Sequence, residues 1–164
     1  MTDAERSLIA SHPLLLYDGV CVLCNGVVKF VVRNDKRAEF RFAPLESAVA
    51  EEFLAEATNA REGVVLVTDT LGPGQKIRHR SDAVSGVLLT LGGGWGVLGR
   101  VLAAVPRPLR EFGYGIVARI RYRLFGRYAA CPIPEPELRS RMVGMEGAEV
   151  PEAARLQGGD GLRR

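Results

Sequence analysis

Two cysteines separated by two residues, Cys21 and Cys24, are the side chains of this sequence best suited to chemistry. They follow an apolar run, 14–17, and the turn signal Asp18-Gly19, and they open a stretch with helical apolar spacing. Amide groups and the positive dipole end at a helix start stabilise a thiolate, so we predict that Cys21 becomes nucleophilic near neutral pH. Cys21 is expected to lie nearer the solvent, and Cys24, one helical turn later, is expected to be the more buried thiol and can close a disulfide on the same face. This pattern indicates a redox site.

Asp18 is the third candidate site residue, because it ends the apolar run three residues before Cys21. A partly desolvated carboxyl group there could take the proton from Cys24 as that thiol attacks a mixed disulfide. It could equally accept backbone amides of the turn or of the helix start and only fix their shape. The sequence leaves both interpretations open.

The cysteines also permit interpretations without catalysis. Cys21 and Cys24 could form half of a zinc site that Cys131 and either His79 or His12 complete, but no second close pair supports this. Cys131 stands in a proline-flanked segment and is expected to be inert; a third redox thiol is the less favoured alternative. We therefore expect no metal and no cofactor other than a redox-active Cys21–Cys24 disulfide.

The composition is that of one ordinary folded domain, with 164 residues, of which 47% are apolar and 25% charged. The net charge is only +3, but basic residues gather between Arg100 and Arg127. We expect them on solvated helix faces; contact with anionic lipid is the less favoured alternative, and no motif predicts nucleic-acid binding. Residues 1–11 carry no secretory pattern and three cysteines make no disulfide framework, which favours a reducing, cytoplasmic location.

Apolar periodicity and turn signals predict an α/β domain. The expected strands are 14–17, 39–43, 63–68 and 75–79, and the expected helices are 21–33, about 47–58, and one capped by Ser81 or Asp82. This order (βαβ, helix, β-hairpin, helix) is that of the thioredoxin fold, with the first strand central because it is apolar throughout.

Two additional C-terminal helices are expected beyond the glycines at 92–94, at about 97–105 and 108–125. Gly113 and Gly115 weaken the second of these or mark a close helix contact. The thioredoxin-like domain is therefore expected to span 14–143, including a helical extension at about 97–127. A flexible arm at 1–13 should precede it, and a disordered tail at 144–164 should follow.

Several short stretches stand in the order in which one known family has them: Tyr17-Asp18-Gly19-Val20-Cys21-Val22-Leu23-Cys24-Asn25, Phe42-Ala43-Pro44-Leu45, Ser81-Asp82-Ala83, Leu91-Gly92-Gly93-Gly94-Trp95 and Arg121-Tyr122-Arg123-Leu124-Phe125-Gly126-Arg127. Through them the sequence resembles the DCC family of thiol–disulfide oxidoreductases over roughly 14–143. The resemblance implies a thioredoxin-like fold and disulfide oxidoreductase chemistry, but no particular substrate.

Two departures from thioredoxin itself concern the substrate. The dipeptide between the cysteines is Val22-Leu23, without the Gly-Pro or Pro-His that sets the turn in relatives of thioredoxin. Thioredoxins also place a proline just before the third strand, where the backbone pairs with substrate, whereas this sequence has Gly63 before Val64. Docking of an extended peptide beside the site is therefore less expected.

Two classes of function follow. The favoured one is a thiol–disulfide oxidoreductase of the protein-disulfide reductase type, in which Cys21 attacks a protein or small-molecule disulfide and Cys24 resolves the mixed disulfide. The alternative is a non-catalytic thioredoxin-like or zinc-stabilised adaptor whose basic C-terminal helices bind a partner or a membrane surface.

Overall fold

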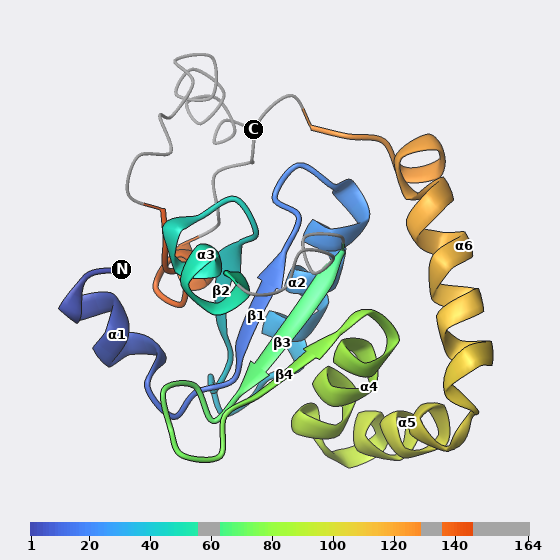
Figure 1. The fold of residues 1–164 in the computed structure, drawn as a ribbon, viewed down its shortest axis with the longest axis horizontal. Coiled ribbons are helices and arrows are strands. Elements are labelled where there is room, and N and C mark those ends of the chain that lie inside the picture. Colours follow the sequence, from blue (N-terminus) through green and yellow to red (C-terminus); the bar gives the residue numbers. More distant parts are fainter. Residues whose placement is uncertain (56–62, 129–135, 146–164) are drawn as a thin grey trace, which may run out of the picture.

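The protein is built on a four-stranded mixed sheet with strand order β2-β1-β3-β4 (Figure 1). The strands of this computed structural model, which describes residues 1–55, 63–128 and 136–145, are β1 (Leu14–Tyr17), β2 (Arg41–Pro44), β3 (Val64–Thr68) and β4 (Lys76–His79). β1 runs parallel to β2 and antiparallel to β3, and β3 is antiparallel to β4. The prediction of a central first strand is confirmed.

Helices cover both faces of the sheet. Leu15 and Tyr17 belong to one buried cluster, with residues of α2 (Val22–Asn34) and α4 (Arg80–Leu91). Leu14 and Leu16 belong to a second cluster, with residues of α1 (Asp3–Ile9) and α3 (Ala48–Leu54). A strand that buries both of its faces needs the continuous apolar run that β1 has. The layers and topology confirm the predicted thioredoxin-like α/β fold.

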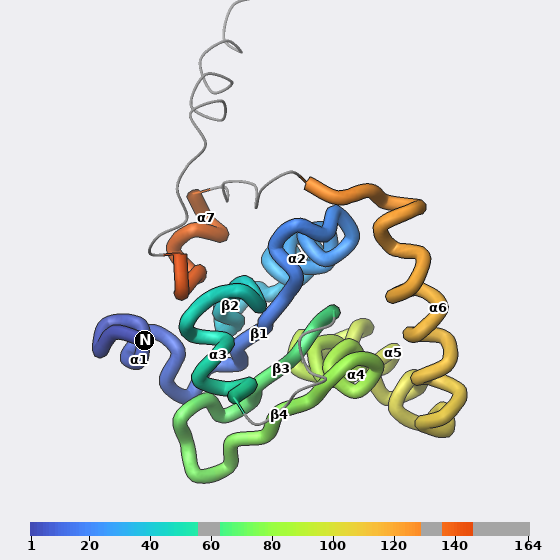
Figure 2. The backbone as a smooth tube through the Cα atoms, turned by 45° about the horizontal axis from the view of Figure 1, so that its top comes forward, coloured from blue at the N-terminus to red at the C-terminus, as the bar shows by residue number. Residues whose placement is uncertain are grey.

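The additional C-terminal helices are α5 (Gly93–Ala104) and α6 (Arg107–Phe125), and both were expected. α5 packs on α4, and α6 then returns along the side of the molecule past α4 and α2 (Figures 1 and 2). The close helix contact that was considered for Gly113 and Gly115 lies instead at Gly99, where a β-carbon would lie 2.9 Å from the backbone nitrogen of Leu89.

The start of α4 differs from the expectation, because the helix begins at Arg80 and its N-cap is His79. The two residues expected to cap it bond to α6 instead. Ser81 donates to the Glu111 carboxylate, and Asp82 accepts from Arg110 Nη1 at 2.9 Å. The side chains of Ser81 and Asp82 therefore bond to a distant helix, although the local sequence favours them as helix caps.

Both ends of the described chain carry structure that the sequence did not predict. Residues 3–9 were expected in a flexible arm but form α1, with a capping box between Thr2 and Glu5 and with Ile9 fully buried. Helix α7 (Pro136–Arg139) leads into a segment that lies along β2, where Val143 donates its amide to the Phe42 carbonyl at 2.9 Å. The expected tail lies outside the described residues from 146 onward.

Candidate active site

The two cysteines lie where β1 turns into α2. Cys21 is the N-cap of this helix, and its Sγ accepts the backbone amide of Cys24 at 3.3 Å. Asn25 is buried, and its Nδ2 donates to the Gly19 carbonyl at 2.8 Å and to the Cys21 carbonyl at 3.0 Å. The side-chain amide of Asn25 thus fixes the turn that presents Cys21. The predicted position of Cys21 at the start of this helix is confirmed.

Both thiols are buried, and Cys21, which was expected to lie nearer the solvent, is 0% exposed against 4% for Cys24. Cys21 is buried because residues 127 and 128 lie over it, which the sequence did not predict. Arg127 forms an antiparallel bridge with Cys21, and the amide of Tyr128 donates to the Val20 carbonyl at 2.8 Å. The expected difference in exposure is therefore wrong.

The electrostatic environment distinguishes the two thiols. Burial raises the pKa of the Cys24 thiol strongly, and the neighbouring Cys21 sulfur and Asp18 act in the same direction, while Arg121 acts against them. Cys24 is therefore held as a neutral thiol over the physiological range of pH. An acceptor that removes its proton must accompany any attack by this sulfur.

The Asp18 carboxylate is buried and has partners on α6. Its Oδ1 accepts the Val20 amide at 3.2 Å, which is the turn contact that one interpretation required. Its Oδ2 accepts from Arg121 Nη2 at 3.2 Å and from the hydroxyl of Tyr122. The carboxylate therefore joins the active-site turn to a helix that lies far away in the sequence.

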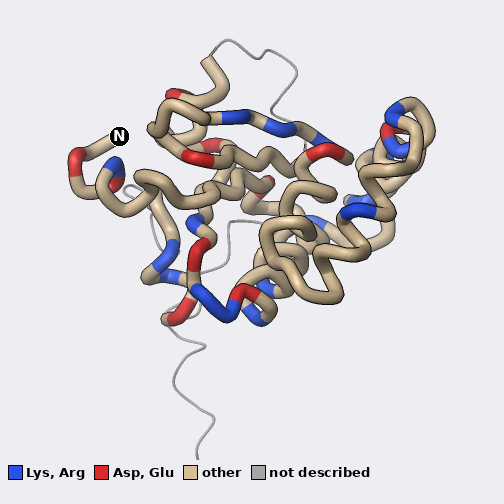
Figure 3. Tube along the Cα trace, turned by 90° about the horizontal axis from the view of Figure 1, so that it is seen from below, with Lys and Arg blue, Asp and Glu red and all other residues tan. Residues whose placement is uncertain are grey.

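Arg121 is the functional residue that sequence reasoning missed. The basic stretch was expected on solvated faces, and charged residues are indeed spread around the molecule (Figure 3), but the side chain of Arg121 is only 9% exposed. Although burial opposes its charge, contacts with Tyr122 and both thiols leave the pKa of Arg121 raised. Its one sequence signal is membership of the stretch 121–127 that carries the family resemblance.

Tyr114 occupies the place at the start of β3 where thioredoxins pair with substrate. Its hydroxyl oxygen accepts the Val64 amide at 3.2 Å and packs against Gly63, where it would lie 1.9 Å from an added β-carbon. Burial raises the pKa of Tyr114, and the Val64 amide opposes that rise. Because the Val64 amide is already bonded, it is not free to pair with a peptide.

The zinc alternative required Cys131, which lies outside the described residues. Among the residues that the structure describes, no group of three or more His, Cys, Asp and Glu side chains could hold a metal ion. In the same part of the chain, no helix is both long and apolar enough to cross a membrane.

Comparison with known proteins agrees with this geometry. The family model of DCC1-like thiol-disulfide oxidoreductases matches residues 15–127. The chain belongs to this family. Residues matched by the DCC1-like model include both cysteines, Asp18, Tyr114 and Arg121.

Two relatives are similar to this chain over most of its length. A protein of Bacillus subtilis named uncharacterized protein YuxK is 32% identical over 133 residues, which is 79% of this chain and 93% of that protein. A chloroplastic DCC family protein of Arabidopsis thaliana is 33% identical over 122 residues, 74% of this chain and 70% of its own. No solved structure matches the chain. The family name indicates thiol–disulfide redox chemistry.

Proposed function

We propose that this DCC1-like protein is a thiol–disulfide oxidoreductase whose Cys21–Cys24 pair cycles between dithiol and disulfide. The observation that carries the proposal is the position of Cys21 at the N-cap of α2, with its sulfur accepting the Cys24 amide. A helix start lowers the energy of a thiolate, and the thiolate is the form that attacks a disulfide. The second sulfur stands one helical turn away, within reach for ring closure.

The proposed reaction has two steps. The Cys21 thiolate attacks one sulfur of the substrate disulfide, which breaks the substrate S–S bond and releases a thiolate. Cys24 then loses its proton and attacks the Cys21 sulfur, so that the Cys21–Cys24 disulfide forms and the second substrate thiolate leaves. Because Cys21 is fully buried, a disulfide substrate reaches it only when residues 126–128 move aside.

Asp18 is our candidate for the proton acceptor in the second step. Its carboxylate is buried at the same turn and interacts electrostatically with the Cys24 thiol. Its Oδ2 lies 3.2 Å from Arg121 Nη2, which holds the carboxylate in place at the turn.

Trapping tests the proposal directly. Cys24→Ser should accumulate a mixed disulfide on Cys21 when it is mixed with hydroxyethyl disulfide, because the resolving thiol is absent. Wild type should release the thiol product, and Cys21→Ser should do neither. Mass spectrometry under acid quench identifies the species. Retained turnover in Cys21→Ser, or no adduct in Cys24→Ser, would reject the proposed roles.

A further inference from the structure

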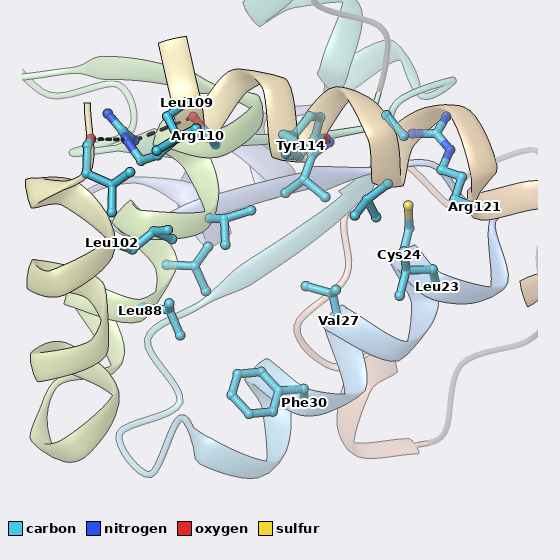
Figure 4. Close-up of a pocket in the computed structure, with 18 residues that line it drawn as sticks. Leu23, Cys24, Val27, Phe30, Leu88, Leu102, Leu109, Arg110, Tyr114 and Arg121 are labelled. Carbon is cyan, nitrogen blue, oxygen red and sulfur yellow. Dashed lines mark hydrogen bonds between the residues drawn. The ribbon is translucent and has the colours of Figure 1, made fainter. Parts of the chain in front are cut away.

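A pocket of about 580 Å³ lies between α2, α4, α5 and α6, a size within the range of about 300–1,000 Å³ that is typical of small-molecule sites. Its walls are apolar, and they include Val27, Phe30, Leu88, Leu102 and Leu109. Figure 4 shows Leu88, Leu102 and Leu109 at one end and Cys24 with Arg121 at the other. The redox pair therefore faces an apolar chamber through the sulfur of Cys24.

The polar end of this chamber is formed by Arg121, which carries an unsatisfied donor. Arg121 uses Nη2 to bond Asp18 and Tyr122, but its Nε is buried and has no hydrogen-bond partner. A buried donor without a partner costs free energy, which an acceptor oxygen would recover if the Arg121 side chain turned this nitrogen toward a ligand. Tyr114 lines the same pocket and has its O–H hydrogen to offer, since its oxygen serves as the acceptor for Val64.

A peptide does not fit these surroundings. An extended chain needs backbone partners, and the Val64 amide that could serve is bonded to Tyr114. The remaining wall offers apolar side chains almost throughout. The occupant must therefore combine an apolar body with an acceptor oxygen at the end that meets Arg121 and Cys24.

We propose that the pocket binds a quinone, which reoxidises the Cys21–Cys24 pair after a substrate dithiol has reduced it by the reverse of the exchange reaction; this rests on the redox function proposed above. The S–H bonds of the two cysteines break and one S–S bond forms. The two electrons and two protons released convert both quinone carbonyls to hydroxyls. Arg121 stabilises the negative charge that develops on the nearer quinone oxygen as electrons arrive. Disulfide exchange occurs at Cys21 under residues 126–128, and quinone reduction occurs at Cys24 in the pocket.

Filling the pocket tests the assignment. Gly113 lines the pocket on α6, and an added β-carbon there meets nothing within 4 Å, so Gly113→Phe should place a ring in the open space. Ile116→Phe adds the same ring to the same helix at a residue outside the pocket lining and is the matched control. Val117→Trp, at a half-exposed lining residue, is a second plug should Gly113→Phe not fold.

The probe is duroquinone, whose ring carbons all carry methyl groups and resist addition of thiols. Each reduced protein is mixed anaerobically with it, and disulfide formation is measured by mass spectrometry against quinone concentration. In wild type and Ile116→Phe, the rate of disulfide formation should saturate with quinone concentration. In the plugged variants it should be about tenfold slower at low quinone concentration, because weaker binding lowers the fraction of protein that holds quinone. Reduction of hydroxyethyl disulfide should be equal in all of them.

Equal quinone rates in plugged and wild-type protein would overturn the proposal. So would sensitivity to the plug with lipoamide but not with duroquinone, which would assign the pocket to a cyclic disulfide. Normal oxidation of the cysteine pair by duroquinone, without any reduction of hydroxyethyl disulfide, would instead reject the proposed exchange reaction. The proposed quinone site would remain supported.

Discussion

The buried cluster of Asp18, Arg121 and Tyr122 sets the chemistry available to single residues at this site. Arg121 and Tyr122 both bond the same carboxylate oxygen, and the Arg121 guanidinium also stacks over the Tyr122 ring at 4.6 Å. Burial raises the pKa of Tyr122, as does its bond to Asp18. Tyr122 therefore remains a neutral hydrogen-bond donor near neutral pH.

Asp18→Asn separates proton transfer from shape at this cluster. The amide keeps an acceptor oxygen for Arg121 but cannot take a proton, so the resolving step should slow about ten- to a hundredfold while Cys21 still reacts with iodoacetamide. Rapid-quench measurement of mixed-disulfide decay gives the rate. Tyr122→Phe is the control, since it removes a bond to the carboxylate but leaves the carboxylate in place. Equal slowing in both variants would show that Asp18 acts only by holding the turn.

Cys24 should make the stability of the reduced protein depend on alkaline pH. Its pKa is raised in the folded state above the ordinary value of 9.0, so its contribution is fully present below pH 9 and is lost as pH rises beyond it. The unfolded chain can ionise there while the folded thiol cannot, at about 1.4 kcal/mol per pH unit. Urea unfolding between pH 8 and about 10 should show this decline in wild type and a weaker one in Cys24→Ala. Parallel curves would contradict it.

Among the elements, α5 is positioned by its close approach to α4. Gly99 is buried at this contact, and a β-carbon would also lie 3.0 Å from Cβ of Leu88. The backbone of α4 cannot yield as a flexible side chain can. Helix packing at this distance fixes one wall of the pocket beside Cys24.

Gly99→Ala should therefore destabilise the protein by about 1–3 kcal/mol, through overpacking against the α4 backbone. Gly113→Ala is the matched control on α6, because nothing surrounds its added methyl and alanine favours helix by about 0.5–1 kcal/mol. The midpoint temperature of thermal unfolding should fall for Gly99→Ala and rise for Gly113→Ala. A stabilised Gly99→Ala would mean that the two helices are free to separate.

The local elements could be predicted because the residues that determine them are neighbours in the sequence. The 14–17 run, the Asp18-Gly19 turn and the two cysteines follow one another in the chain, so β1, the turn and the start of α2 could be predicted from neighbours alone. The partner of Asp18 could not. Arg121 lies 103 residues away from Asp18 in the sequence. Apolar periodicity predicts that Arg121 is on a helix but does not predict which buried group it contacts.

For the molecule as a whole, α5 and α6 are expected to be part of one folding unit with the sheet. Helix α6 supplies Arg121 to Asp18 and Tyr114 to Val64, and α5 covers α4. Yet α6 also leaves large apolar side chains exposed, among them Leu109, Phe112 and Leu124. An isolated helix pair of this size has too little core to fold alone.

Truncation after Gly93 should then yield an insoluble or molten product. It removes the only cation that the structure pairs with Asp18 within the described residues, and it uncovers the apolar face of α4. Strong binding of an environment-sensitive dye, with far-UV but without near-UV circular dichroism, is the expected signature. A soluble fragment that unfolds cooperatively and keeps full activity would contradict this view.

The segments that cover Cys21 and the β2 edge come late in the chain. Residues 126–128 cover Cys21, and the segment that ends at Val143 pairs with Phe42 on β2. Chains fold as they emerge from the ribosome, and an unpaired strand edge invites aggregation. We therefore expect a nascent chain that ends before residue 126 to lack the cover over Cys21 and the partner of the β2 edge. Until residues 126–143 have been synthesised, we expect the thiols to be open to oxidation and the β2 edge to be open to aggregation.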